Sequence, residues 1–294
     1  MFGHRQRPVW AGFQITGLLF FAGASACAQT AGTLTLVEGR LALIRGAAAY
    51  SAAQGVRLDN GDILAVDPKG QAQIEFQDGA ILNLSQGTRA MLTTVARGQG
   101  ARSETEIAVL SGWAKLAQKK SGAPYRFVTP LAQLASTQAT AVLRTGGDFS
   151  EIFVESGPAR FSEAGKRGVS GSARDVKSGE FVVRRGEQAA TAAPRPSAEF
   201  VNTMPRHFRD NLPALLDRFK NSKAQPKREH EVSYAEVEVW LKANPSIRRN
   251  FVKRFQSRTK DAEFRSKLVE NLRAHPEWDP VLFPEKYEPK DPKS

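Results

Sequence analysis

The sequence has little of the chemistry on which most enzymes and disulfide-bonded proteins depend. Its 294 residues include a single cysteine, Cys27, which excludes an intrachain disulfide, a cysteine-based zinc site and a cysteine redox motif. The four histidines are scattered, and no two stand four residues apart, which argues against a zinc site of the H-E-x-x-H type. We therefore expect no catalytic residues, no cofactor and no metal ion, and we expect that the chain is not an enzyme.

Long apolar runs are absent beyond the N-terminal region, where none approaches the roughly 18–20 residues of a membrane-spanning helix. The N-terminal region itself has two arginines, then an apolar stretch over 9–23, then small residues. This order is typical of a signal peptide, which we place at 1–28. Ala26 and Ala28 satisfy the A-x-A rule for cleavage, so Gln29 is the expected first residue of the mature chain.

Two other outcomes remain open for this segment. Cleavage before Cys27 would leave a lipid-anchored N-terminus, although Ala24 stands where lipoprotein signals usually have leucine. Alternatively, the apolar stretch stays uncleaved as an anchor. We expect an exported protein, periplasmic or extracellular, with an outer-membrane lipoprotein as the form that Cys27 would allow.

The first part of the chain has the pattern of short β-strands. Hydrophobic residues make up 41% of the sequence and charged residues 24%, as in globular proteins. Over 31–186, short apolar runs are separated by turn signals about every ten residues, and segments such as 72–76 alternate apolar and polar side chains. The fold class we expect is a mainly β N-terminal domain, solenoid-like or a sandwich of short strands, followed by a small α-helical C-terminal domain.

The second part changes period. Residues 187–199 are small, polar and proline-containing, so we expect a linker. Over 200–275, apolar residues recur at helical spacing, which predicts a small helical domain. Residues 276–294 contain several prolines, and we expect an extended tail there.

The order and spacing of the turns in the β part resemble the FecR domain family, named after the periplasmic sensor of ferric-citrate signalling. The resemblance runs over about 31–185 and rests on a Leu-x-x-Gly-Asp turn from Leu58, a Phe-x-Asp-Gly turn from Phe76 and a later Thr-Pro pair. We expect structural roles for these residues, because glycine supplies positive φ and aspartate bonds nearby backbone amides in tight turns. The turn residues are Gly61, Asp62, Asp78, Gly79, Thr129 and Pro130.

The resemblance implies a non-catalytic module that contacts other envelope components. Family members that regulate sigma factors carry a cytoplasmic domain before a membrane span, whereas only a few residues precede the apolar stretch here. Direct control of a sigma factor would then have no physical route. We expect an exported binding, scaffold or sensing module that contacts an envelope protein or glycan. The alternatives are a trans-envelope signalling regulator with an uncleaved N-terminal anchor, and a cell-wall-acting enzyme.

A cluster of basic residues is the best candidate for a partner-binding surface. The formal net charge is +12, and five basic side chains follow one expected helix and its end. A solvated helix face is one interpretation, and binding of an acidic cell-wall or membrane component is the other. Nucleic acid is not an expected partner, because no recognition motif is present. The expected patch comprises Arg248, Arg249, Lys253, Arg254 and Arg258.

Overall fold

The computed structural model describes residues 30–95, 104–118, 123–164, 173–210 and 213–288. The expected signal-cleavage residues Ala26, Ala28 and Gln29, and the lipidation candidate Cys27, lie outside the described residues. Their assignment stays a prediction.

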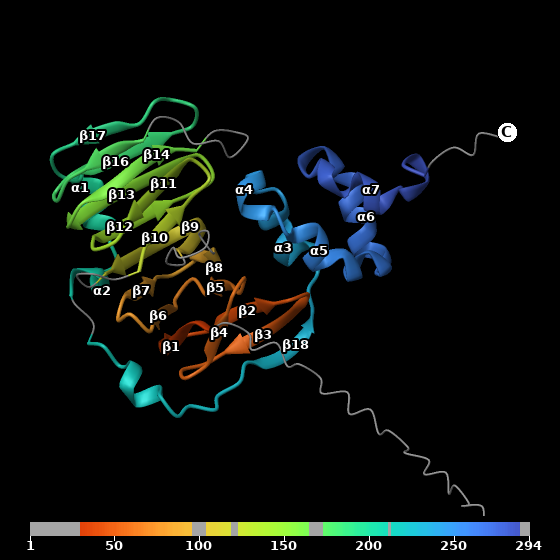
Figure 1. Cartoon of the computed structure of the whole chain (residues 1–294), viewed down its shortest axis with the longest axis horizontal. Coiled ribbons are helices and arrows are strands. Elements are labelled where there is room, and N and C mark those ends of the chain that lie inside the picture. The colour runs from red at the N-terminus through yellow and green to blue at the C-terminus, as the bar shows by residue number, and fades with distance from the viewer. Residues whose placement is uncertain (1–29, 96–103, 119–122, 165–172, 211–212, 289–294) are drawn as a thin grey trace, which may run out of the picture.

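The N-terminal part consists of two facing β-sheets, which confirms the expected β-rich class (Figure 1). Every strand pairing is antiparallel except that between β9 and β10. Sheet A runs in the order β4 (Arg57–Asp59), β1 (Thr30–Glu38), β6 (Gln71–Glu75), β7 (Ile81–Leu84), β9 (Glu104–Ala117), β12 (Thr140–Thr145), β13 (Phe149–Ser156), β16 (Phe181–Arg185) and β17 (Thr191–Ala193). Sheet B runs in the order β18 (Lys227–Glu231), β3 (Ala48–Ala52), β2 (Leu41–Arg45), β5 (Ile63–Val66), β8 (Arg89–Val95), β9, β10 (Tyr125–Val128), β11 (Ala132–Ser136), β14 (Ala159–Glu163) and β15 (Arg174–Val176).

Strand β9 belongs to both sheets and joins them. Its first part pairs with β8 and β10 in sheet B, and its second part pairs with β7 and β12 in sheet A. The change occurs at Gly112, whose φ of +98° is a conformation that side-chain-bearing residues rarely adopt. The Thr88 hydroxyl fixes the bend, because it accepts from Trp113 N at 3.1 Å and donates to Trp113 O at 2.9 Å.

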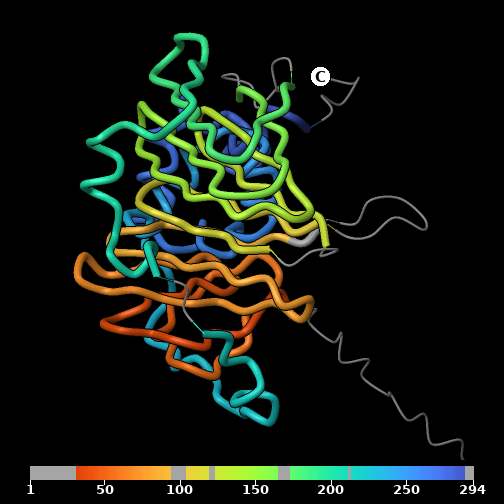
Figure 2. Tube along the Cα trace, turned by 90° about the vertical axis from the view of Figure 1, so that its left-hand side faces the viewer, coloured from red at the N-terminus to blue at the C-terminus, as the bar shows by residue number. Residues whose placement is uncertain are grey.

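The main core lies between the two sheets. Alternate side chains of both sheets point inward, among them Leu34, Leu43, Ile74 and Leu116, and all are buried. Figure 2 shows successive segments stacked in chain order, from red at one end of the β part to green at the other. The sandwich is therefore built like a solenoid, so both expected descriptions apply.

The C-terminal part contains short helices, as expected. They are α1 (Ala198–Thr203), α2 (Arg206–Arg209), α3 (Tyr234–Leu241), α4 (Pro245–Arg248), α5 (Phe251–Phe255), α6 (Ala262–Glu270) and α7 (Asp279–Leu282). Short 3-10 helices η1 (Leu216–Phe219), η2 (Gln256–Lys260), η3 (Leu272–Ala274), η4 (Pro276–Trp278) and η5 (Pro284–Lys286) lie among them.

The chain between β17 and β18 crosses the outer face of sheet A (Figure 1). Phe200 and Phe208 of α1 and α2 are buried against Trp113, Val142 and Phe181 of that face. Polar contacts hold the crossing segment further along, because the Glu75 carboxylate accepts from the backbone N–H groups of residues 215 and 216 at 2.7 and 3.0 Å. We call residues 194–210 and 213–226 the strap.

Helices α3 to α7 cover the outer face of sheet B. A row of apolar side chains crosses that face from strand to strand, since Ile44 pairs with Ile63, Ile63 with Met91, and Met91 with Ala108. This row forms one cluster with buried side chains of the helices, including Trp240. The two halves therefore share a core.

Three expected boundaries need correction. The expected linker 187–199 is only partly irregular, since β17 pairs with β16 and the Ser197 hydroxyl caps α1. The expected helical region 200–275 contains a strand, β18, which extends sheet B beside β3. The expected extended tail 276–294 forms helical turns up to residue 286, because Trp278 and Leu282 pack into the core.

Within the described ranges, no helix has the length and apolar character needed to cross a membrane.

Candidate functional site

The Leu-x-x-Gly-Asp turn lies at the junction between the two halves. Gly61 has φ +88°, and its N–H donates to Leu92 O at 2.7 Å, which ties the turn to β8. Asp62 is almost wholly buried, and its carboxylate accepts from Asp59 N at 2.8 Å. The positive φ of Gly61 and the Asp62 carboxylate together hold the backbone of this turn.

Arg45, at the end of the neighbouring strand β2, contacts the same turn. The Arg45 guanidinium donates to both carboxylate oxygens of Asp62, from Nε at 3.0 Å and from a terminal nitrogen at 2.6 Å. It also contacts the Asp59 carboxylate at 3.0 Å. A two-pronged pair of this kind fixes orientation as well as charge. Burial nevertheless raises the pKa of Asp62, against the opposing effect of Arg45.

Arg254 of α5 attaches the helices to this turn. Its guanidinium donates to the backbone oxygens of Gly61 at 2.5 Å, Ile44 at 2.8 Å and Gly46 at 2.8 Å. The same guanidinium lies over the Phe255 ring, 5.1 Å from its centroid. Burial lowers the pKa of Arg254 to about 10. Gly61 and Arg254, which the sequence suggested for separate reasons, therefore contact each other.

A row of polar side chains runs beside the apolar row of sheet B. In register, Thr93 of β8 pairs with Glu106 of β9, and Glu106 pairs with Arg126 of β10. The Glu106 side chain is 10% exposed and contacts Arg249, whose terminal nitrogen lies 3.3 Å from its carboxylate. Burial raises the pKa of Glu106, although Arg249 and Arg126 oppose the shift.

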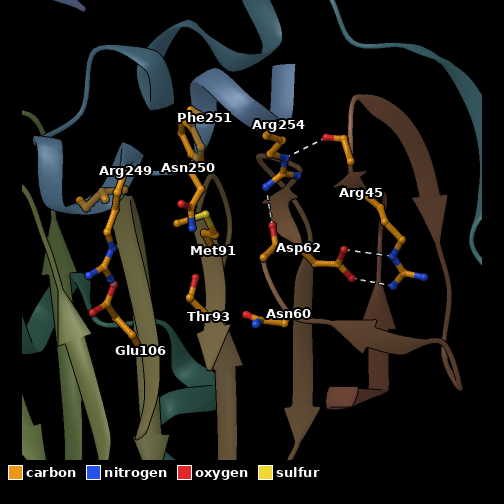
Figure 3. Close-up of a pocket in the computed structure, with 13 residues that line it drawn as sticks. Arg45, Asn60, Asp62, Met91, Thr93, Glu106, Arg249, Asn250, Phe251 and Arg254 are labelled. Carbon is orange, nitrogen blue, oxygen red and sulfur yellow. Dashed lines mark hydrogen bonds and ion pairs between the residues drawn. The ribbon is translucent and has the colours of Figure 1, made fainter. Parts of the chain in front are cut away.

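These groups surround a cleft of about 600 Å³ between sheet B and helices α4 and α5. In Figure 3, Arg249, Asn250 and Arg254 come from the helical side, and Thr93, Glu106 and Asn60 come from the sheet side. Met91, Ile247 and Phe251 supply apolar surface. The volume falls within the roughly 300–1,000 Å³ of ligand pockets, and the lining offers charged and amide groups that could bind a polar partner.

The remaining turn residues of the expected set lie elsewhere and shape the β part. The Asp78 carboxylate accepts from Ala80 N at 3.0 Å, from Ala123 N at 2.9 Å and from the Tyr125 hydroxyl at 3.0 Å. Gly79 completes that turn with φ +82°.

The Thr-Pro pair links the two sheets just after β10 ends. The Thr129 hydroxyl lies 2.8 Å from that of Ser150 in sheet A, and Asn244 of the helical half donates to Pro130 O at 2.8 Å. The Thr-Pro pair and the Phe-x-Asp-Gly turn thus position strands, and neither lines the cleft.

The expected basic patch is not one exposed surface. Arg248 is buried and donates to the backbone oxygens of Leu241 and Ala274 at 2.8 and 2.7 Å, and Arg254 is enclosed as described. Arg258 donates to Val232 O at 2.9 Å. These side chains stabilise the helical half because a buried guanidinium needs acceptors. Arg249, in the cleft, and Lys253, which is exposed, retain accessible charge.

Sequence reasoning missed Arg45, Thr93, Glu106 and Asn250. Thr93 and Glu106 lie at outward-facing positions of their strands, each next to an apolar outward side chain of the same strand. A polar residue at such a position is a signal of a binding site, but it is equally typical of a side chain that faces solvent. Pairing across sheet B was needed to place them together.

Among the described residues, no group of three or more histidine, aspartate or glutamate side chains is arranged to hold a metal ion.

By fold, the protein is a two-sheet β-sandwich with solenoid-like stacking and a helical cover that shares its core. Residues 62–160 match the family model described as FecR protein, the family that the sequence resembles. The matched region begins at Asp62 of the cleft turn and ends in β14.

Two solved structures are similar to this chain in part. They are crystal structures, at 2.50 and 1.65 Å resolution, of a candidate anti-sigma factor from Parabacteroides distasonis ATCC 8503. Their sequence identities are 12% and 13%, and each alignment has a TM-score of 0.38 and covers 48% of this chain. This chain spans 62% of the length of those chains. No curated protein matches the sequence.

Proposed function

We propose that this protein is a regulator of signalling in the cell envelope and that its FecR domain and helical cover together bind another envelope protein. The observation that carries the proposal is the FecR match over residues 62–160. That family takes its name from a sensor of ferric-citrate signalling and is regulatory rather than enzymatic.

The cleft supports the proposal because it lies on the first turn of the matched region. Asp62 and Gly61 form its floor, and Arg249 and Asn250 of the helical half form its opposite wall. A partner bound there would contact both halves at once. Binding could therefore change how firmly the helices hold the turn, which is a physical route for a regulatory response.

Of the functions expected from the sequence, the FecR match favours the trans-envelope signalling regulator over an exported scaffold or glycan-binding module. This function requires a segment that stays in the membrane, and the apolar stretch over 9–23 is the candidate. We therefore propose an exported FecR domain with a retained N-terminal anchor. Intact-mass measurement of the protein recovered from envelopes tests the anchor, because a mature N-terminus at Gln29 would contradict it.

Crosslinking in cells tests the binding function. A photo-reactive amino acid replaces Thr93 in the cleft or, as the control, Val201, which is 39% exposed on α1 at sheet A. We expect one envelope protein to be captured from position 93 and not from position 201. Equal capture from both positions, or none, would contradict a partner at the cleft.

A transcription measurement separates the two candidate functions. Cells that lack the protein should show changed transcription of a small set of genes, restored by the full chain. Specific capture at position 93 without any such change would instead support the exported scaffold.

A further inference from the structure

We infer that the cleft binds a carboxylate group and that Arg249 is the side chain that receives it. The inference rests on the proposed function only for the source of the carboxylate. If the proposed function holds, that source is an acidic side chain of the partner protein. A free organic acid is the other source of the same chemistry.

The charges that line the cleft do not balance. Three arginines and two acidic residues line it, and Arg45 is paired with Asp62 through two hydrogen bonds and with the Asp59 carboxylate, outside the lining, at 3.0 Å. Arg254 donates to three backbone oxygens of the β half. The wall therefore carries a positive charge that is stabilised by backbone dipoles, by the Phe255 ring and by the nearby Asp62 carboxylate. An anion in the cleft would be attracted to it, because the interaction is weakly screened where water is partly excluded.

Arg249 is available where Arg254 is not. It contacts the Glu106 carboxylate at 3.3 Å, and its side chain is 51% exposed. A guanidinium pairs best with a carboxylate through two parallel hydrogen bonds, as Arg45 does with Asp62. The Arg249 guanidinium can therefore exchange its single contact with Glu106 for a pair of hydrogen bonds to the carboxylate of a ligand.

Glu106 then acts as an internal competitor for Arg249. Burial already disfavours the charged form of Glu106, which raises its pKa. When Arg249 turns to a ligand, the Glu106 carboxylate loses its positive partner, and this costs free energy. A neutral glutamine at position 106 would not have that cost. The apolar surface of Ile247 and Phe251 beside Arg249 suits the aliphatic stem of a glutamate side chain or a short dicarboxylate.

This arrangement predicts opposite effects for the two members of the pair. Arg249→Gln should weaken carboxylate binding about tenfold, the loss of one charge-assisted pair. Glu106→Gln should strengthen binding about threefold or more, because it frees Arg249 and removes a negative charge from the site. Lys253→Gln, the matched control, removes the same charge as Arg249→Gln at an exposed position outside the lining and should change affinity less than about twofold.

The experiment measures fluorescence anisotropy of a labelled hexaglutamate peptide, blocked at both ends, on titration with the purified full chain. A hexaglutamine peptide is the neutral control. Glutarate and inorganic phosphate serve as competitors. Competition by glutarate as strong as that by the unlabelled peptide indicates a free organic acid, whereas much weaker competition indicates an acidic protein segment.

Three results would overturn the inference: equal losses in the Arg249 and Lys253 variants, no gain in the Glu106 variant, or displacement by phosphate at lower concentration than by either carboxylate. The expected gain in Glu106→Gln cannot arise from unfolding, so a folding defect in one variant does not leave the question open. Specific crosslinking at position 93 without carboxylate binding would overturn this inference and leave the proposed function standing. Carboxylate binding without any crosslinked partner would support this inference and contradict the proposed function.

Discussion

Arg254 shows how a residue with the sequence signature of a surface charge becomes part of an interface. Its spacing from neighbouring basic residues suggested a solvated helix face. In the structure, its three donors reach backbone oxygens of the β half, so the side chain joins segments about two hundred positions apart in sequence. The stability of the junction should therefore depend on this one guanidinium.

Arg254→Gln is expected to lower the free energy of unfolding by about 3 kcal/mol, because it leaves the backbone oxygens of Ile44, Gly46 and Gly61 without their donor, the first and last of them partly buried. Lys253→Gln, in the same helix but exposed, should change it by less than about 0.5 kcal/mol. Urea unfolding followed by tryptophan fluorescence measures both. Similar small effects in the two variants would show that Arg254 does not hold the halves together.

His275 predicts a pH dependence of stability. It is fully buried beside Tyr234, whose hydroxyl lies 3.2 Å from its Nε2, and burial lowers its pKa. Nearby Glu277 opposes this shift, and Arg248 and Lys242 add to it. The unfolded chain thus binds a proton near pH 6.5 that the folded chain resists, so the free energy of unfolding should fall as the pH falls below about 6.5.

The comparison of wild type with His275→Gln isolates this effect. The variant should lose part of the slope of unfolding free energy against pH between about pH 6.5 and 5. The buried carboxyls of Asp62 and Glu106, whose pKa values are raised, act with the opposite sign at lower pH and are the same in both proteins. Parallel curves for the two proteins over this interval would contradict the prediction.

At the scale of elements, strand β9 carries the architecture because it passes from one sheet into the other. At Gly112 the chain continues as one strand with a bend. The positive φ of Gly112 permits the bend, and the Thr88 hydroxyl holds it. A glycine with positive φ is thus the point at which this strand passes from one sheet into the other.

Gly112→Ala should lower the free energy of unfolding by at least about 3 kcal/mol. A Cβ at this position would lie 2.5 Å from Thr88 Cα, in addition to the strain of a φ of +98°. Gly87→Ala is the control, because Gly87 also has positive φ, +66°, but a Cβ there meets no atom within 4 Å. Its cost should be limited to about 1 kcal/mol of backbone strain. Equal costs in urea unfolding would contradict the crowding argument.

At the scale of the whole molecule, the C-terminal part covers both faces of the sandwich. The strap buries Phe200 and Phe208 on sheet A, β18 extends the edge of sheet B, and helices α3 to α7 bury its apolar row. The sandwich and its cover are therefore one cooperative structure rather than two domains that happen to be linked.

A chain ending at residue 193 tests this description. It would expose Trp113, Val142 and Phe181 on one face and the apolar row through Ile63 and Met91 on the other. Exposed apolar patches of this kind favour self-association. We expect the shortened protein to elute as aggregates in size-exclusion chromatography and to bind a hydrophobic dye. A monomer with the unfolding midpoint of the full chain would contradict a shared core.

The sequence by itself determined the local structure of this protein. The Gly-Asp pair at 61–62 and the Asp-Gly pair at 78–79 specify turns through backbone conformation and short side-chain hydrogen bonds, and alternation of apolar residues specifies strands. These are interactions within a few residues, so composition and spacing were sufficient to predict a β part of the FecR type and a helical part after it.

Only the tertiary structure decided which of these elements meet. Strand pairing in sheet B places Thr93 beside Glu106, and docking of α4 and α5 brings Arg249 to that pair and Arg254 to Gly61. The same docking gives Trp278 and Leu282 a core to enter, which is why a proline-containing tail forms helical turns. Contacts between residues far apart in sequence depend on shape and burial across the whole fold, and the period of a single segment does not encode them.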